Sequence, residues 1–147
     1  MIILIKKIKM DNTLIKDTIT LDSNQESINK VTSYIDSIYS SYPTDISETY
    51  GNVIIAMTEA VNNAINHGNK NDSTKKVTIS YKKTDDNLSY TVEDEGNGFD
   101  YDNVPDPTDP ENLLKLNGRG IYLMKNLVDE IHFHEDGKKI ELIFKTA

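Results

Sequence analysis

The chain has 147 residues, a length that fits one domain with a hydrophobic core of its own. It contains no cysteine, which excludes disulfides, thiolate metal sites and cysteine nucleophiles and is typical of a reducing compartment, so we expect a cytoplasmic protein. The formal net charge of −8 would repel a phosphate backbone, so general nucleic-acid binding is not expected.

The N-terminal run MIILIKKIKM has five apolar residues before Lys6, and lysine recurs at Lys7 and Lys9. Such a run is too short and too charged for a signal-peptide core or a membrane span, so we expect no membrane association. With the following TLIKDTITL it reads as two strands separated by the turn-forming pair Asp11-Asn12.

Two segments with helical periodicity follow. The first helix is expected over about residues 24–40, opened by Ser23 and Glu26 at the spacing of a capping box. The second begins near Asp45 and runs to about His67, with Gly68 as its stop. Both have apolar residues at three-to-four spacing, namely Ile28, Val31, Ile35 and Ile38 in the first and Val53, Ala56, Met57, Ala60 and Ala64 in the second.

The rest of the chain predicts two hairpins and one helix. KVTISYK and LSYTVED alternate in period two, which indicates an antiparallel hairpin. After a glycine- and proline-rich loop over residues 96–118, GIYLMKNLVDE has helical spacing, and IHFHED and KIELIFK form a last hairpin around Gly137. This order predicts an α+β two-layer sandwich over residues 1–147, with a mixed, mostly antiparallel sheet and helices on one face.

The stretch TEAVNNAINHG places three asparagines in a predicted helix, where asparagine is a poor helix former. Glu59 and Asn63 are four residues apart and share one face, which Asn66 and His67 continue. A carboxylate can orient or deprotonate an attacking hydroxyl, and an amide oxygen suits a magnesium ion held by phosphates. A solvated helix face is the plainer alternative for the pair alone.

The stretch VEDEGNGFD ends a strand at Asp94 and continues with Gly96 and Gly98, where the backbone can turn sharply and approach a ligand. An ionised carboxylate accepts hydrogen bonds only, so Asp94 can receive the exocyclic amino group of adenine, which guanine lacks at that position. The alternative is a plain turn.

The stretch NGRGIYLM opens the last helix with Gly118 and Gly120. The free amide groups and the dipole of a helix start make an anion site, and Arg119 can add positive charge. A glycine N-cap without a ligand is the alternative reading.

In this order and spacing, the three motifs resemble the ATPase domain shared by gyrase, the Hsp90 chaperone, histidine kinases and MutL, the GHKL superfamily. They are most similar to the bacterial anti-sigma-factor serine/threonine protein kinases, over nearly the whole chain. The resemblance implies a Bergerat-type ATP-binding fold that binds ATP and Mg²⁺. It also implies a role for each motif residue: Glu59 as general base, Asn63 as magnesium ligand, Asp94 as adenine-reading carboxylate, Gly96 and Gly98 as walls of the adenine pocket, Gly118, Arg119 and Gly120 as phosphate binders, and residues 100–117 as a lid. His67 is expected close enough to the phosphates to assist, and Asn66 either lines the phosphate pocket or is solvated.

The sequence departs from the resembling kinases at one position. These kinases often carry a threonine after the glycine of the last hairpin, where it supports adenine recognition, but here Lys138 follows Gly137. The departure puts the affinity for nucleotide in question, although Asp94 and both glycines of its motif are present.

The resemblance implies a kinase that phosphorylates a serine or threonine of a small antagonist protein, which competes with a sigma factor for the kinase. It also implies a homodimer, and we expect a self-contained module without a second domain. Two alternatives stay open. One is an ATP-gated module that sequesters its partner without phosphorylating it, and the other is a catalytic domain that phosphorylates histidine in trans.

Two other patterns suggest metal sites and are set aside. His132 and His134 alternate with Ile131 and Phe133 on a predicted strand, so both histidines are expected to face solvent. The run DYDNVPD at residues 100–106 resembles a calcium loop but lacks the required glycine and the distant glutamate.

Overall fold

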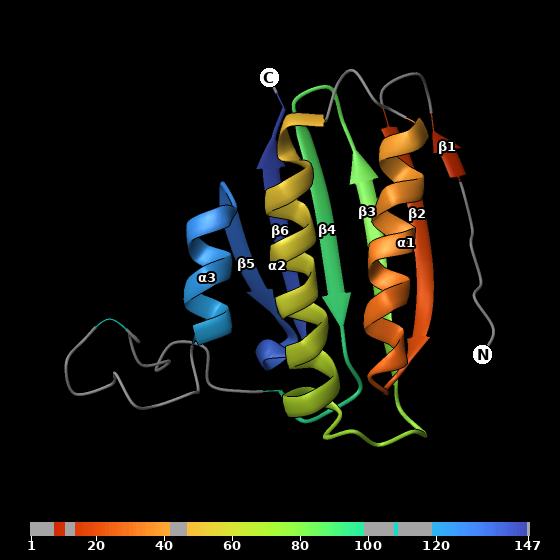
Figure 1. The fold of residues 1–147 in the computed structure, drawn as a ribbon, viewed down its shortest axis with the longest axis vertical. Helices are drawn as coiled ribbons and strands as arrows, with labels where there is room; N and C mark the ends of the chain where they lie inside the picture. The colour runs from red at the N-terminus through yellow and green to blue at the C-terminus, as the bar shows by residue number, and fades with distance from the viewer. Residues whose placement is uncertain (1–7, 11–13, 42–46, 99–107, 109–118, 147) are drawn as a thin grey trace.

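The computed structural model describes residues 8–10, 14–41, 47–98, 108 and 119–146. Six strands and three α-helices follow one another along this part of the chain (Figure 1). The strands are β1 (Ile8–Met10), β2 (Leu14–Asp22), β3 (Lys76–Lys83), β4 (Asn87–Glu93), β5 (Glu130–His134) and β6 (Lys139–Lys145), and the helices are α1 (Glu26–Ser41), α2 (Tyr50–Asn63) and α3 (Arg119–Leu127). Each corresponds to an element expected from the sequence.

The six strands form one sheet in the order β1-β2-β3-β4-β6-β5, and every described pair of neighbours is antiparallel. The register brings apolar residues opposite one another: Ile79 pairs with Ile19 and with Val92, and Val92 pairs with Ile140. Because side chains alternate between the two faces of a strand, this register gathers apolar residues on one face.

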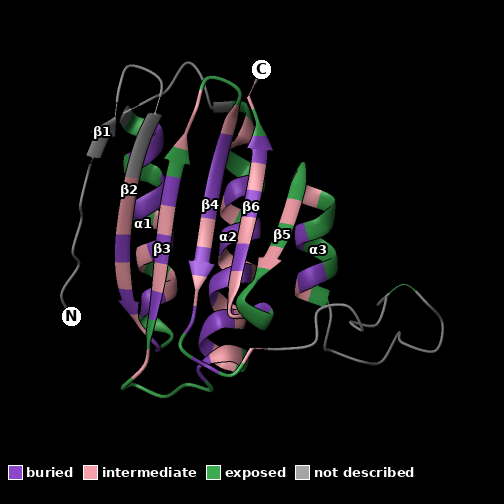
Figure 2. Cartoon of the chain, turned by 180° about the vertical axis from the view of Figure 1, so that it is seen from behind, coloured by how far each residue is buried: buried purple, intermediate pink, exposed green. Residues whose placement is uncertain are grey.

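The three helices cover that face, as Figures 1 and 2 show from opposite sides. α2 lies in the middle and packs against α1 on one side and α3 on the other. The structure therefore confirms the predicted α+β two-layer sandwich. Fully buried side chains come from both layers, including Tyr90 and Phe144 from the sheet and Ile35, Met57 and Met124 from the helices.

The start of α1 differs from the predicted capping box. The Ser23 hydroxyl donates a hydrogen bond of 2.6 Å to the Lys75 carbonyl, instead of capping the helix. Asn24 takes the capping position, because its Oδ1 accepts a hydrogen bond of 3.2 Å from the Ser27 N–H. A tertiary contact to the start of β3 thus replaces the local one that the spacing predicts.

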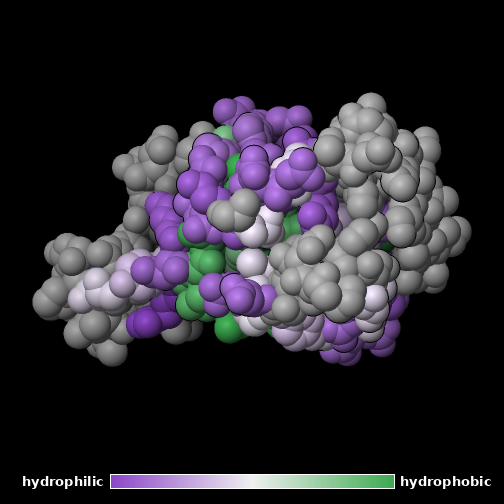
Figure 3. Space-filling view, turned by 90° about the horizontal axis from the view of Figure 1, so that it is seen from above, coloured by the Kyte–Doolittle hydropathy of each residue, from purple (hydrophilic) through white to green (hydrophobic). Residues whose placement is uncertain are grey.

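The two ends of the sandwich differ in character. Figure 3 views the end that carries the β3–β4 turn, where hydrophilic residues dominate the described surface and a small apolar area lies between them. The opposite end carries the motifs identified in the sequence. Among the helices of the described residues, none is long and apolar enough to cross a membrane.

Candidate functional site

Four segments meet at the end that is lowest in Figure 1: the last turns of α2, the end of β4, the start of α3 and the β5–β6 turn. Several of their closest approaches occur at glycines. A glycine lets a backbone approach another group more closely than any residue with a Cβ would allow. The positions of these glycines therefore show where two segments come too close to leave room for a side chain.

Glu59 and Asn63 of α2 face the first turn of α3. A Cβ added to Gly120 would lie 2.9 Å from Glu59 Oε2, 3.2 Å from Asn63 Nδ2 and 3.5 Å from Asn63 Oδ1. Both side chains are half-buried and lie one turn apart on the same helix. The first N–H groups of a helix have no partner within it, so the carboxylate and the amide lie beside a place suited to an anion.

Asp94 lies directly after β4 at the same end of the sandwich. The residue is 9% exposed, and its Oδ1 accepts a hydrogen bond of 2.8 Å from the Gly96 N–H. Burial raises the pKa of the Asp94 carboxyl above its ordinary value, while the bond from Gly96 and the charges of Lys138 and Lys75 act in the opposite direction. Asp94 is therefore a hydrogen-bond acceptor in a largely desolvated position.

Two glycines fit closely around Asp94. A Cβ added to Gly68 would lie 2.3 Å from Asp94 Oδ2, and one added to Gly96 would lie 1.9 Å from the Gly68 carbonyl oxygen. A larger residue at Gly96 would force the Gly68 backbone away from the turn that follows β4, and a larger residue at Gly68 would displace either the Asp94 carboxylate or that backbone. The sequence predicts Gly68 only as a helix stop and gives no sign of its contact with Asp94.

Gly98 packs against the β5–β6 turn. Its φ is +80°, and a Cβ there would lie 2.0 Å from the Asp136 carbonyl oxygen. The turn itself is left-handed at three successive residues, with φ of 53° at Glu135, 57° at Asp136 and 90° at Gly137. The next residue, Lys138, accepts a hydrogen bond of 2.9 Å from the Asp94 N–H at its carbonyl. The position at which the sequence departs from the resembling kinases therefore adjoins Asp94.

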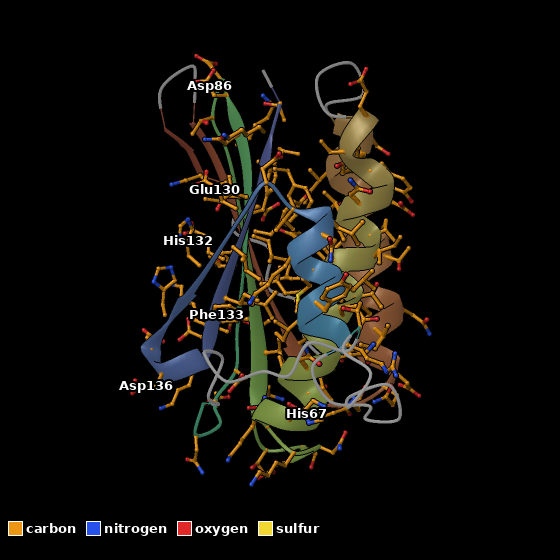
Figure 4. All side chains as sticks on the ribbon, turned by 90° about the vertical axis from the view of Figure 1, so that its left-hand side faces the viewer. His67, Asp86, Glu130, His132, Phe133 and Asp136 are labelled. Atoms are coloured by element: carbon orange, nitrogen blue, oxygen red, sulfur yellow. The ribbon has the colours of Figure 1, made fainter. Side chains whose placement is uncertain are left out.

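The turn that directly follows α2 departs from α-helical geometry. Ala64–Gly68 form a π-helical turn, closed by a hydrogen bond of 2.8 Å from the Asn69 N–H to the Ala64 carbonyl. Such a turn is wider than an α-helical one and rotates the residues that follow. Asn66 Oδ1 accepts a hydrogen bond of 3.2 Å from Gln25 Nε2, next to the start of α1. The exposed His67 lies at the lower end of α2 in Figure 4.

The structure thus differs from the expectation that Asn66 continues the face of Glu59 and Asn63. Asn66 turns toward α1, whereas the other pair faces α3. The described residues include Arg119, which is exposed as the first residue of α3. Gly118 and the expected lid, apart from Thr108, lie outside the described residues, as does the calcium-like run at 100–106.

The two strand histidines face away from the helices. Figure 4 shows Glu130 and His132 on the open face of β5, while Phe133 packs against the core. His132 Nε2 lies 3.7 Å from Glu130 Oε1, and His134 Nε2 lies 3.5 Å from Glu141 Oε1. In the described part of the chain, no group of three or more His, Cys, Asp or Glu residues could hold a metal ion. The solvent-facing interpretation of both histidines is confirmed.

Sequence reasoning also missed Asn69. It is 1% exposed, and its side-chain amide makes three hydrogen bonds to other segments of the chain. It lies in the run HGNKND, where the neighbouring Lys70 and Asn71 are exposed. Composition and spacing give no signal that separates the buried asparagine from its exposed neighbours.

Comparison with known proteins identifies a family that covers this end of the sandwich. The family model of the histidine kinase-like ATPase domain matches residues 21–144, which include all four segments of the site. Similar proteins include the serine-protein kinase RsbW of Bacillus subtilis (strain 168), 36% identical over 83 residues, which are 52% of this chain and 52% of that protein.

Two further relatives carry the same name. The serine-protein kinase RsbW of Staphylococcus epidermidis is 31% identical over 97 residues, 60% of this chain and 61% of the relative. That of Bacillus licheniformis is 35% identical over 88 residues, 56% of this chain and 55% of the relative. The chain therefore matches between 52% and 61% of the length of these three relatives.

Proposed function

Because this chain belongs to the histidine kinase-like ATPase domain family, we propose that it is a serine/threonine protein kinase of the anti-sigma-factor type that uses ATP and Mg²⁺. The observation that carries the proposal is the placement of Glu59 and Asn63 against Gly120. It sets a carboxylate and an amide beside the start of a helix, where phosphates bind well. The names of the three relatives support the kinase class.

Glu59 is the general base of the proposed reaction. The hydroxyl oxygen of the acceptor serine or threonine attacks the γ-phosphorus of ATP, and its proton passes to the Glu59 carboxylate. The bond from the γ-phosphorus to the bridging oxygen breaks, and ADP leaves. Little covalent chemistry falls to the protein in such a transfer, so positioning and charge stabilisation dominate. The half-buried position of Glu59 next to α3 supports this role.

The residues present fit a magnesium ion held mainly by phosphates. Asn63 would hold it through Oδ1, a neutral oxygen of the kind that Mg²⁺ accepts beside phosphate and water ligands. The missing side chain of Gly120 leaves the place in front of that oxygen open, since a Cβ there would lie 3.5 Å from it. When bound, Mg²⁺ neutralises charge on the phosphates. The amides of Gly118, Arg119 and Gly120 would bind the same phosphates, with His67 as an outer neighbour.

Asp94 is the proposed adenine-reading residue. Its buried carboxylate keeps acceptor capacity beyond the hydrogen bond from Gly96, and the exocyclic amino group of adenine is a donor. Gly96 and Gly98 shape the pocket by allowing close approach of the backbone. Lys138 meets Asp94 through its carbonyl, so its side chain is not needed for that contact.

The proposed protein substrate is a small antagonist protein with an acceptor serine or threonine. A sigma factor is the proposed second partner, and the kinase is proposed to act as a cytoplasmic homodimer. These proposals extend the sequence resemblance. The relatives' names support the acceptor class, since all three are called serine-protein kinases.

The test incubates the pure chain with γ-labelled ATP, Mg²⁺ and a candidate antagonist protein. Acid-stable label on the antagonist is the expected result, and the Glu59→Gln variant should give none. ATP-dependent complex formation without label would support sequestration instead of catalysis. Acid-labile label would indicate transfer to histidine. Either of these two results contradicts the proposal.

A further inference from the structure

Asn69 connects four segments of the chain at the candidate site. Its Nδ2 donates to Ser23 Oγ at 2.8 Å and to the Lys76 carbonyl at 3.0 Å. Its Oδ1 accepts a hydrogen bond of 2.7 Å from the Glu95 N–H. The amide thus joins the segment after the π-helical turn to the β2–α1 connection, to the start of β3 and to the turn after β4.

The orientation of this amide follows from its partners. The Lys76 carbonyl can only accept and the Glu95 N–H can only donate, so Nδ2 must face the first and Oδ1 the second. The Ser23 hydroxyl donates to the Lys75 carbonyl and is therefore able to accept from Asn69. With the side chain 1% exposed, water cannot replace these bonds, so each one holds its segment in place.

Glu95 lies between the two residues that define the adenine end of the proposed site. The Glu95 N–H belongs to the peptide bond that joins Asp94 to Glu95. The N–H of the next residue, Gly96, donates to Asp94 Oδ1 at 2.8 Å. The Glu95 carboxylate also accepts a hydrogen bond from the Lys76 N–H. Asn69 and β3 together therefore fix the peptide between Asp94 and Glu95.

We propose that Asn69 is a positioning residue that sets the orientation of the Asp94 carboxylate through the Glu95 backbone, and thereby the preference of the site for adenine. The inference rests on the proposed function, because it takes Asp94 as the adenine-reading group. Asn69 does not touch the base in this account. It acts by preventing the 94–96 turn from rotating when the carboxylate receives the amino group.

Ser23→Ala is the matched control for Asn69→Ala. Both variants delete a buried polar group from the same hydrogen-bond network, and both leave partners unsatisfied. Only Asn69→Ala removes the acceptor of the Glu95 N–H, while Ser23→Ala leaves it in place. A purely structural role would reduce stability in both variants without changing the choice between bases.

The experiment measures dissociation constants of ATP and GTP with Mg²⁺ for the full chain and both variants, at a temperature at which all three are folded. We expect Asn69→Ala to lower the preference for ATP over GTP by about tenfold, the size of one hydrogen-bond contact, and Ser23→Ala to keep the wild-type ratio. An unchanged ratio in Asn69→Ala would overturn this inference alone. A wild-type chain that binds neither nucleotide would overturn the proposed function as well.

A second measurement tests the positioning role of Asn69 if Asn69→Ala does not fold. Hydrogen exchange at the Glu95 amide of the wild-type chain should be slower than in an unstructured peptide, because Asn69 Oδ1 holds its proton. Addition of ATP should slow it further, and addition of GTP should do so less. Free exchange at this amide, or equal effects of the two nucleotides, would contradict the positioning role.

Discussion

Gly120, in the first turn of α3, lies so close to Glu59 of α2 that a Cβ there would stand 2.9 Å from the carboxylate oxygen. The neighbouring contact would be with the amide of Asn63, at 3.2 Å. A methyl group at this position would therefore occupy the space in front of the proposed base and the proposed magnesium ligand. The contact is with the flexible ends of two side chains, so the backbone can stay where it is.

Gly120→Ala should separate activity from stability. The added methyl group displaces Glu59 and Asn63, and we expect phosphoryl transfer to fall by at least about tenfold, because catalysis depends on placement within less than 1 Å. Alanine is a better helix former than glycine, so the free energy of unfolding should rise by up to about 1 kcal/mol. Steady-state kinetics and urea unfolding measure the two effects.

Gly51→Ala is the control for that variant. Gly51 is the second residue of α2 as Gly120 is of α3, and a Cβ at Gly51 would meet nothing within 4 Å. It should give the same small gain in stability and leave phosphoryl transfer unchanged. Equal activity in the two variants would show that the approach of Gly120 to Glu59 has no catalytic consequence.

Gly68→Ala should act at the other side of the site. The new Cβ would lie 2.3 Å from Asp94 Oδ2, so the carboxylate must move or the end of α2 must shift. We expect the affinity for ATP to fall by about tenfold or more, with a loss of about 1–3 kcal/mol of stability from the overpacking. Calorimetric titration and thermal unfolding check this. Wild-type affinity in a folded variant would contradict the close fit around Asp94.

Glu59→Gln should abolish phosphoryl transfer and leave ATP binding largely intact. Glutamine keeps the size of the side chain but cannot take the proton of the acceptor hydroxyl. Transfer to the antagonist and ATP affinity are measured on the same preparation. A variant that transfers phosphate at the wild-type rate would rule out Glu59 as the base.

Asp94→Asn should weaken ATP binding, because one acceptor oxygen becomes a donor that faces the amino group of adenine.

Asp94→Asn should also change the pH dependence of stability. Burial raises the pKa of Asp94 in the folded state above its ordinary value of 3.8, so the folded state holds this proton to higher pH than the unfolded state does. The stability contributed by the protonated group is present below pH 3.8 and is lost as pH rises through the raised pKa.

The measurement compares the free energy of unfolding of the wild-type chain and Asp94→Asn from below pH 3.8 to above the raised pKa of Asp94. The wild-type value minus the variant value should decrease as pH rises through the window, because the variant lacks the titrating group. A difference that grows with pH would mean that the carboxylate is stabilised as an ion and would contradict its desolvated position.

Regular periodicity allowed the sequence to predict the helices and strands well. Val53 and Met57 recur at helical spacing, and Val77 and Ile79 alternate as in a half-buried strand, so their buried positions follow from local pattern. The spacing of Glu59 and Asn63 likewise predicted their shared face. These features arise within a single helix or strand, where the separation of two residues in the sequence fixes their separation in space.

Tertiary contacts account for what the sequence did not predict. Ser23 has the spacing of a capping residue, but its hydroxyl bonds to Lys75, 52 positions along the chain. The π-helical turn at Ala64–Gly68 redirects Asn66, and no local propensity signals it. Asn69 and Gly68 acquire their importance only because β4 ends beside them. Such positions depend on how separate elements meet.

A crystal structure of the chain with a non-hydrolysable ATP analogue and Mg²⁺ would test nucleotide binding at this site most directly. We expect one nucleotide between α2, β4 and α3, with the adenine amino group donating to Asp94, the metal bound by Asn63 and the γ-phosphate near Glu59. A nucleotide bound elsewhere, or none at saturating concentration, would rule out the proposed site.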